Sequence, residues 1–203
     1  MTETSDDERH RAKMAKRKAV QDAEVAGKTI ETKGLLIVHT GPGKGKSTAA
    51  FGLALRALGR GRRVGVVQFG KGAWVSGERL ALESFGDRVV WHTMGEGFTW
   101  ETQDRARDVA AATRAFDKAK ELMADPSIFL LVLDELNISL RYDHLPLAEV
   151  VEVLRARRDD LHVVVTGRNA KPELVEAADL VTEFGATKYH FAAGVKAQEG
   201  IEF

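Results

Sequence analysis

Leu35-Leu-Ile-Val-His-Thr40 runs directly into Gly41-Pro-Gly-Lys-Gly-Lys-Ser-Thr48, and an alanine-rich stretch follows. The apolar run predicts a buried strand, the glycines predict a tight loop, and the residues after Gly45 predict a helix. In such a loop the backbone N–H groups converge on phosphate oxygens, the helix N-terminus adds partial positive charge, and a lysine reaches the terminal phosphates. We therefore expect a nucleoside triphosphate site. Its predicted contacts are Gly41, Pro42, Gly43, Lys44, Gly45, Lys46, Ser47 and Thr48.

The loop departs in one place from the strict phosphate-loop pattern, Gly-x4-Gly-Lys-[Ser/Thr]. The first glycine of that pattern falls on Thr40, and the chain has its glycine one residue later. Gly45-Lys46-Ser47, however, opens a predicted helix directly after a buried strand, and a turn without a ligand explains this combination poorly.

A second motif supplies the expected partner of the loop. Phe129-Leu-Leu-Val-Leu-Asp134-Glu135 is an apolar strand that ends in two carboxylates, as strands opposite phosphate loops do. The Ser47 hydroxyl, with Asp134 or Glu135, is predicted to hold magnesium directly or through water. Lys46, Ser47 and Glu135 are the predicted catalytic residues.

Short apolar runs alternate with helical stretches from Gly34 onward, a pattern that predicts an α/β fold. We expect a phosphate-loop, RecA-like, mostly parallel sheet of about six strands with helices on both faces. The predicted strands are Leu35–Thr40, Arg63–Phe69, Val89–His92, Phe129–Asp134, His162–Thr166 and Leu180–Glu183. The predicted helices lie near residues 46–59, 77–85, 101–124, 147–158 and 171–178.

Residues 1–33 differ from the rest of the chain, because acidic and then basic residues occur there with almost no large apolar side chains. Ser5 and Glu8 have the spacing of a capping box, and Gly27 is a plausible stop, so we expect a polar helix from Ser5 to Ala26. We interpret residues 1–33 as a mobile helical arm and residues 34–203 as the catalytic domain. A solvated tail is the alternative, and the basic cluster could also suggest RNA.

The composition excludes several classes of function. Thirty basic residues balance thirty acidic ones among 203, so there is no net positive charge to gather nucleic acid or anionic lipid. The chain has no cysteine, which excludes disulfides, thiolate metal sites and cysteine nucleophiles. No apolar run approaches the roughly 20 residues that span a bilayer, so we expect no membrane segment and a cytoplasmic location.

Several motifs together resemble one known family. They are Gly41-x-Gly-Lys-Gly-Lys-Ser-Thr-Ala-Ala-Phe-Gly52, Val66-Val-Gln-Phe-x-Lys-Gly72, Gly77-Glu-Arg79, Gly97-Phe-Thr-Trp-Glu-Thr-Gln103, Val132-Leu-Asp-Glu-Leu136, Thr166-Gly-Arg168 and Gly194-Val-Lys-Ala-Gln-x-Gly-Ile201. In this order they look like the ATP:corrinoid adenosyltransferases of cobalamin biosynthesis, whose loop has the shifted glycine. Pro42 and Phe203 depart from the family pattern, and Pro42 removes one loop N–H donor.

The resemblance implies transfer of the 5′-deoxyadenosyl group of ATP to the Co(I) centre of cob(I)alamin or a related corrinoid, with release of inorganic triphosphate. It implies magnesium or manganese, an external reductant such as a flavoprotein, and a homodimer. It implies that Phe98 and Trp100 cover the lower corrin face, and that Arg56 contacts phosphates or nucleoside. Gln68, Phe69 and Arg168 are weaker candidates for corrinoid or nucleotide contact.

Alternatives stay open at this point. Arg56 is equally well explained as a solvent-facing helix residue, and packing is the alternative explanation for Gln68, Phe69 and Arg168. The six histidines show no ligand spacing, so we interpret them as structural or surface residues. The rival functions are a general ATPase or small-molecule kinase on the same loop, and a nonenzymatic module gated by nucleotide.

Overall fold

The computed structural model describes residues 3–30, 32–70, 75–94 and 104–202. The chain separates into two compact units, residues 1–33 and residues 34–203. Among its described residues the first unit contains one helix, α1 (Glu3–Ala26), whose described side chains are nearly all exposed. Because α1 begins at Glu3, Ser5 lies inside the helix and is not the N-cap that the sequence predicts. Exposed ion pairs one turn apart, such as Lys18 with Asp22 at 2.6 Å, accompany this polar helix.

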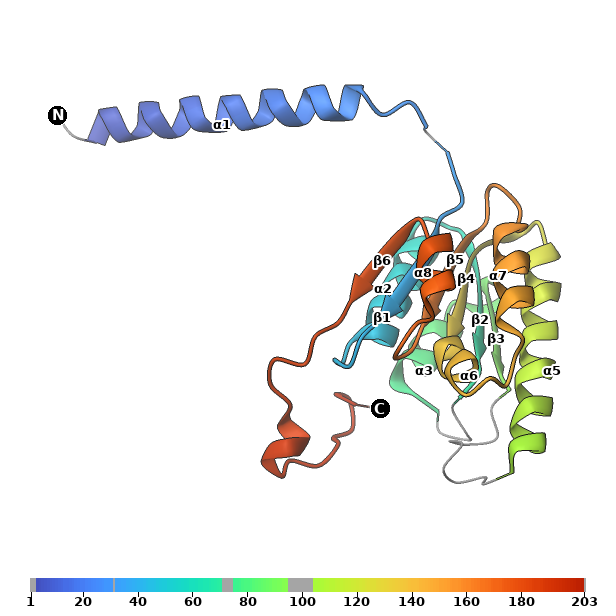
Figure 1. Ribbon diagram of the computed structural model, residues 1–203. Helices are drawn as coiled ribbons and strands as arrows, with labels where there is room; N and C mark the ends of the chain where they lie inside the picture. Colours follow the sequence, from blue (N-terminus) through green and yellow to red (C-terminus); the bar gives the residue numbers. More distant parts are fainter. Residues whose placement is uncertain (1–2, 31, 71–74, 95–103, 203) are drawn as a thin grey trace. The chain divides into compact units, whose positions relative to one another are not determined.

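The second unit is built on one six-stranded sheet (Figure 1). Its strands run in the order β3-β2-β4-β5-β1-β6, and every neighbouring pair is parallel. Their bounds are β1 Leu36–Thr40, β2 Arg63–Gln68, β3 Val89–Thr93, β4 Ile128–Asp134, β5 His162–Thr166 and β6 Leu180–Glu183. Only β5 separates the phosphate-loop strand β1 from β4, so the carboxyl ends of these two strands lie at one edge of the sheet.

Helices cover both faces of the sheet. They are α2 Lys46–Gly59, α3 Gly77–Glu83, α5 Arg105–Ala124, α6 Leu136–Arg141, α7 Leu147–Arg155 and α8 Pro172–Ala177, with 3₁₀ turns at Gly86–Arg88 and His190–Ala193. Successive strand residues alternate between two buried apolar clusters, because strand side chains point to opposite faces. Val38, Leu131 and Val163 join the cluster under α5, α6 and α7, whereas Ile37 and Val132 join the cluster under α2. The predicted RecA-like parallel sheet with helices on both faces is confirmed.

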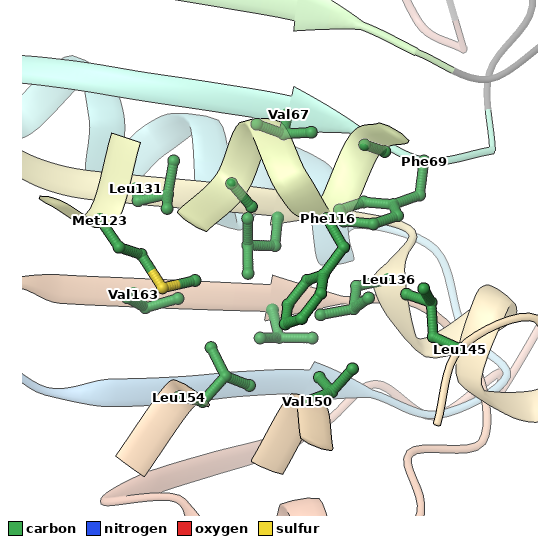
Figure 2. Close-up of a cluster of buried hydrophobic side chains, with 14 of the residues drawn as sticks. Val67, Phe69, Phe116, Met123, Leu131, Leu136, Leu145, Val150, Leu154 and Val163 are labelled. Atoms are coloured by element: carbon green, nitrogen blue, oxygen red, sulfur yellow. The ribbon is translucent and has the colours of Figure 1, made fainter. Parts of the chain in front are cut away.

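Phe116 of α5 lies at the centre of the larger cluster (Figure 2). Around it pack strand residues such as Leu131 and Val163 and helix residues such as Leu136 and Val150. Phe69 belongs to the same cluster, one residue beyond the end of β2. The core therefore reaches the edge of the sheet where the phosphate loop begins.

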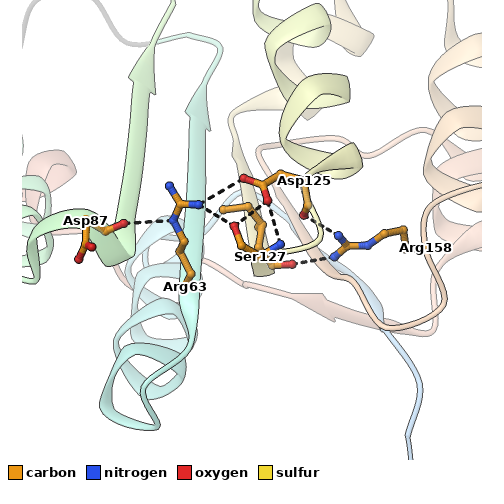
Figure 3. A network of polar contacts seen from close by, with 6 residues as sticks. Arg63, Asp87, Asp125, Ser127 and Arg158 are labelled. Carbon is orange, nitrogen blue, oxygen red and sulfur yellow. Dashed lines mark hydrogen bonds and ion pairs between the residues drawn. The ribbon is translucent and has the colours of Figure 1, made fainter.

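A polar network links the amino ends of the strands, at the edge of the sheet opposite the phosphate loop (Figure 3). Arg63, the first residue of β2, donates to Ser127 Oγ at 2.6 Å and to the Asp125 carboxylate at 3.3 Å. Arg158 donates to the carbonyl oxygens of Asp125 and Ile128. The network lies at the amino ends of β2 and β4, away from the phosphate loop, and we assign it a structural role.

The helix predicted near residues 147–158 ends three residues earlier, at Arg155, and two other helices also differ from the sequence expectations. The helix predicted near residues 101–124 begins at Arg105, because the Asp104 side chain caps it by accepting from the Arg107 amide at 3.2 Å. Helix α6 is not predicted, since it has six residues and follows β4 after only Glu135. None of the helices in the described residues is long and apolar enough to cross a membrane.

Candidate functional site

The phosphate loop is pressed against the chain that leaves β6. The Gly43 amide donates to the Phe184 carbonyl at 2.7 Å, and the Phe184 amide donates to the Thr40 carbonyl at 2.9 Å. A Cβ at Gly41 would lie 2.6 Å from the Phe184 carbonyl oxygen, and a Cβ at Gly43 would lie 2.3 Å from the Gly185 carbonyl oxygen. Both glycines are therefore needed for close approach of two backbones. Because the Gly43 N–H is already used, it is not a free phosphate donor.

Gly45 ends the loop and starts α2. Its φ of 99° is in the left-handed region that favours glycine, and its carbonyl accepts from the Ala49 amide at 2.8 Å. No side chain caps α2, so its first N–H groups are available to an anion. Ser47 is partly buried in this turn, whereas Thr48 is exposed.

Lys46 is 7% exposed, and its ammonium group lies back over the loop. Its Nζ donates to the carbonyl oxygens of Gly41 at 2.9 Å and Gly43 at 2.5 Å. Burial lowers the pKa of Lys46, while the nearby charge of Glu135 opposes that shift. The charges of Arg168 and Lys44 lower the same pKa further. Lys46 therefore lies within electrostatic range of the carboxyl ends of β4 and β5.

His39 supports the backbone of the loop lysine. Its Nδ1 donates to the Lys46 carbonyl at 3.1 Å, since a carbonyl can only accept, and its ring meets the Phe184 ring edge-on at 5.3 Å. Burial lowers the pKa of His39, which is 5% exposed. The structure thus places this histidine in packing and support of the loop, as the sequence suggests.

The two acids at the end of β4 have different environments. Asp134 is fully buried, and its two carboxylate oxygens accept from Gln68 Nε2 at 2.9 Å and Thr166 Oγ1 at 2.8 Å. Glu135 is partly exposed and has a φ of 64°, which is uncommon for a residue other than glycine. Thr166 also accepts the Glu135 amide at 2.9 Å. Asp134 therefore supports the carboxyl edge of the sheet, whereas Glu135 is the acid whose negative charge acts on the Lys46 ammonium.

Two glycines leave space around Glu135. A Cβ at Gly70 would lie 3.4 Å from the Glu135 Cβ, and a Cβ at Gly167 would lie 3.2 Å from its Oε2. Within the described ranges no group of three or more histidine, cysteine, aspartate or glutamate side chains is arranged as a metal site. Mg²⁺, however, binds through one or two protein oxygens and keeps several waters. The Ser47 hydroxyl and the Glu135 carboxylate are a donor set of that kind, so the residues fit this metal.

The remaining predicted site residues fall into four groups. Gln68 and Phe69 are 2% and 5% exposed, so the structure favours the packing interpretation for both. Arg56 is exposed in the last turn of α2, ten residues and about 15 Å along the axis from Lys46, so it is not brought to the loop. Arg168 is exposed near the loop. Phe98 and Trp100 lie outside the described residues.

Sequence reasoning missed other members of this edge. The Asn137 amide donates to the Gly167 carbonyl at 3.0 Å and fixes the turn after β5. Glu202, near the C-terminus, contacts Lys44 of the loop. A polar residue at the end of a strand is a weak signal that could have indicated Thr166, but nothing in the pattern indicates Asn137 or Glu202.

Comparisons with known proteins identify the family of the chain. The model of the family ATP:corrinoid adenosyltransferase BtuR/CobO/CobP matches residues 32–203, and that of the cob(I)alamin adenosyltransferase N-terminal segment matches residues 1–25. The chain is 56% identical to a corrinoid adenosyltransferase of Sinorhizobium sp., over 98% of this chain and 93% of the relative. It is 53% identical to one of Pseudomonas aeruginosa, over 97% of both. It is 48% identical to corrinoid adenosyltransferase CobA of Salmonella typhimurium, over 97% of this chain and 99% of the relative. The chain belongs to the ATP:corrinoid adenosyltransferase family.

Proposed function

We propose that this chain transfers the 5′-deoxyadenosyl group of ATP to the Co(I) centre of a corrinoid. The Co(I) electron pair forms the bond to C5′, the bond from C5′ to the triphosphate oxygen breaks, and its electron pair leaves with inorganic triphosphate. The observation that carries the proposal is the membership of the chain in this family, together with a phosphate loop over which the ammonium group of the buried Lys46 lies.

The reaction requires charge stabilisation more than proton transfer. Co(I) brings its own electron pair, so no side chain has to deprotonate the nucleophile. The protein has to align cobalt with C5′ and stabilise the negative charge that accumulates on the leaving triphosphate. A buried lysine and the free N–H groups at the start of α2 are suited to this task.

Nucleotide binding would exchange the hydrogen-bond acceptors of the Lys46 ammonium group. In the structure its ammonium donates to the Gly41 and Gly43 carbonyls, and we propose that triphosphate oxygens replace these acceptors. Because the Gly43 amide already donates to Phe184, the proposed phosphate donors are the amides of Lys44 to Thr48. This set leaves out Gly43, which is among the contacts predicted from the sequence.

We assign the metal to Ser47 and Glu135. Asp134 is excluded as a direct ligand in this proposal, since it is fully buried and both its oxygens accept hydrogen bonds within the protein. Magnesium or manganese bound there would neutralise charge on the triphosphate.

The corrinoid side of the site is proposed from the family resemblance. Phe98 and Trp100 remain the predicted cover of the corrin face, and Arg168 is the exposed residue near Lys46 that could contact corrinoid or nucleotide. Homodimerisation, the external reductant and the cytoplasmic location also stay predictions.

The test is an anaerobic assay with full-length protein, ATP, Mg²⁺ and chemically reduced cob(I)alamin. We expect the corrinoid absorbance to change to that of adenosylcobalamin, with one triphosphate released for each product formed. ADP accumulating without corrinoid would contradict the proposal and indicate an ATPase or kinase. Tight ATP binding without any turnover would indicate a nonenzymatic module.

A further inference from the structure

The C-terminal tail, residues 184–202, begins and ends on the phosphate loop. It begins there because Phe184 exchanges backbone hydrogen bonds with Thr40 and Gly43. It returns because Glu202, eighteen residues later, contacts Lys44 of the same loop. Within this tail lies the Gly194–Ile201 motif, to which the proposed reaction assigns no role.

The contact between tail and loop is a small cluster of charged and aromatic groups. Glu202 Oε2 accepts from Lys44 Nζ at 2.5 Å, and Glu202 Oε1 lies 3.3 Å from His190 Nε2. The Lys44 ammonium also lies 5.7 Å from the centre of the Tyr189 ring. The Glu202 side chain is 13% exposed, whereas that of Lys44 is 55% exposed. The tail thus holds an acid in place against a lysine that solvent can still reach.

The backbone of the tail holds the acid in position. The amides of Ile201 and Glu202 both donate to the Gln198 carbonyl, at 3.2 and 2.9 Å. Gly200 in this turn has a φ of 76°, a value that favours glycine. Glu202 is therefore part of a formed turn, which fixes where its carboxylate lies.

We propose that Glu202 competes with triphosphate for Lys44, weakens triphosphate binding and so favours its release after transfer. The inference rests on the proposed function, because it takes the loop to be the triphosphate site. It concerns the leaving group of the reaction, which carries the phosphate charges of ATP and one more on the oxygen released from C5′.

The sign of the effect follows from charge. If triphosphate displaces Glu202, the ion pair with Lys44 is lost; if Glu202 stays, a carboxylate lies beside a polyanion. Both arrangements disfavour the bound anion. Glu202 offers no compensating gain by keeping Lys44 charged, because a lysine is already protonated at neutral pH without a partner.

The test measures binding of inorganic triphosphate with Mg²⁺ to the full-length protein by isothermal titration calorimetry. Glu202→Gln keeps the shape of the side chain and an oxygen for His190, and removes the charge. We expect it to bind triphosphate between about 2- and 5-fold more tightly, the range that exposed ion pairs support. Glu199→Gln, an exposed acid in the same tail, is the matched control and should leave the affinity unchanged.

A double-mutant cycle shows whether Lys44 carries the effect. In the Lys44→Gln background, Glu202→Gln should tighten binding much less than it does in the wild-type background. In the transfer assay, inorganic triphosphate should inhibit Glu202→Gln more strongly by the same factor.

Equal or weaker triphosphate binding by Glu202→Gln would overturn the inference while leaving the phosphate site intact. So would an equal gain from Glu199→Gln, which would show a general charge effect. If the wild-type protein binds no triphosphate, the proposed site and the inference both fail.

Discussion

Replacing Lys46 by methionine should abolish most of the transfer activity without unfolding the protein. Lys46 is 7% exposed and carries its charge at a buried position, so burial lowers its pKa. Methionine loses two hydrogen bonds to loop carbonyls, each contributing about 0.5–1.5 kcal/mol. It also removes the cost of burying a charge, which acts in the opposite direction. We expect the free energy of unfolding to change by about 1 kcal/mol or less.

The effect on turnover should be far larger. Lys46 is the donor proposed to stabilise charge on the leaving triphosphate, and loss of one such donor reduces turnover by about 10²–10³, or about 2.7–4 kcal/mol. The assay is anaerobic adenosyl transfer to cob(I)alamin at saturating ATP, with denaturant unfolding measured in parallel. Lys120→Met, which removes a lysine on the surface of α5, is the control and should retain activity. Unchanged turnover of a folded Lys46→Met protein would refute the role assigned to the loop lysine.

Three further predictions concern the acids, the buried histidines and the arm. Glu135→Gln should reduce turnover by about 10² with little loss of stability. Asp134→Asn should instead lower the free energy of unfolding by about 1–3 kcal/mol, because the buried oxygens of Asp134 accept hydrogen bonds. Turnover and denaturant unfolding are measured for both variants, and the reverse pattern would exchange the roles of the two acids. Burial lowers the pKa of His39 and His144, so the unfolded chain takes up protons first as the pH drops below about 6.5, and the free energy of unfolding should fall. The loss should be about 1.4 kcal/mol for each tenfold difference in proton affinity between the unfolded and folded chains. Unfolding at a series of pH values measures it, and an unchanged slope of the free energy of unfolding against pH in His39→Gln would contradict the contribution of that residue. Deleting residues 1–30 should leave the main unfolding transition in place and weaken corrinoid retention in equilibrium dialysis; full retention would make the arm a solvated tail.

The strands could be predicted from sequence because a parallel sheet covered on both faces needs continuous apolar runs. Leu36–Thr40 and Ile128–Asp134 are such runs, and each lies within a residue or so of its prediction. Helix α6 could not be predicted, because its six residues carry no capping signal and its start depends on the left-handed backbone of Glu135. That conformation is imposed by the end of β4 and has no signature in the residues themselves.

The site was predicted only in part for a similar reason. A glycine-rich loop indicates a phosphate site, but it does not show that Gly41 and Gly43 also make room for the backbone of Phe184 and Gly185. Whether Asp134 or Glu135 is available to a metal depends on burial, which only the folded sheet decides. The contact between Lys44 and Glu202 joins residues 158 apart, and no local pattern reports such a pair.

The two lysines of the loop are held by the protein itself in different ways, and this difference bears on turnover. The Lys46 ammonium donates to neutral carbonyl oxygens. When charged triphosphate oxygens replace these acceptors, the attraction becomes stronger, so this exchange favours binding. The Lys44 ammonium pairs with the Glu202 carboxylate, so triphosphate would replace one anion by another, and this exchange favours binding little. The released triphosphate presents to the loop the charges of ATP and one more, on the oxygen that C5′ has left. An enzyme that bound both anions only through exchanges that favour binding would retain its product. A site that combines one exchange of each kind can hold ATP and still release triphosphate, provided that nucleoside contacts, which only ATP makes, supply the difference in affinity.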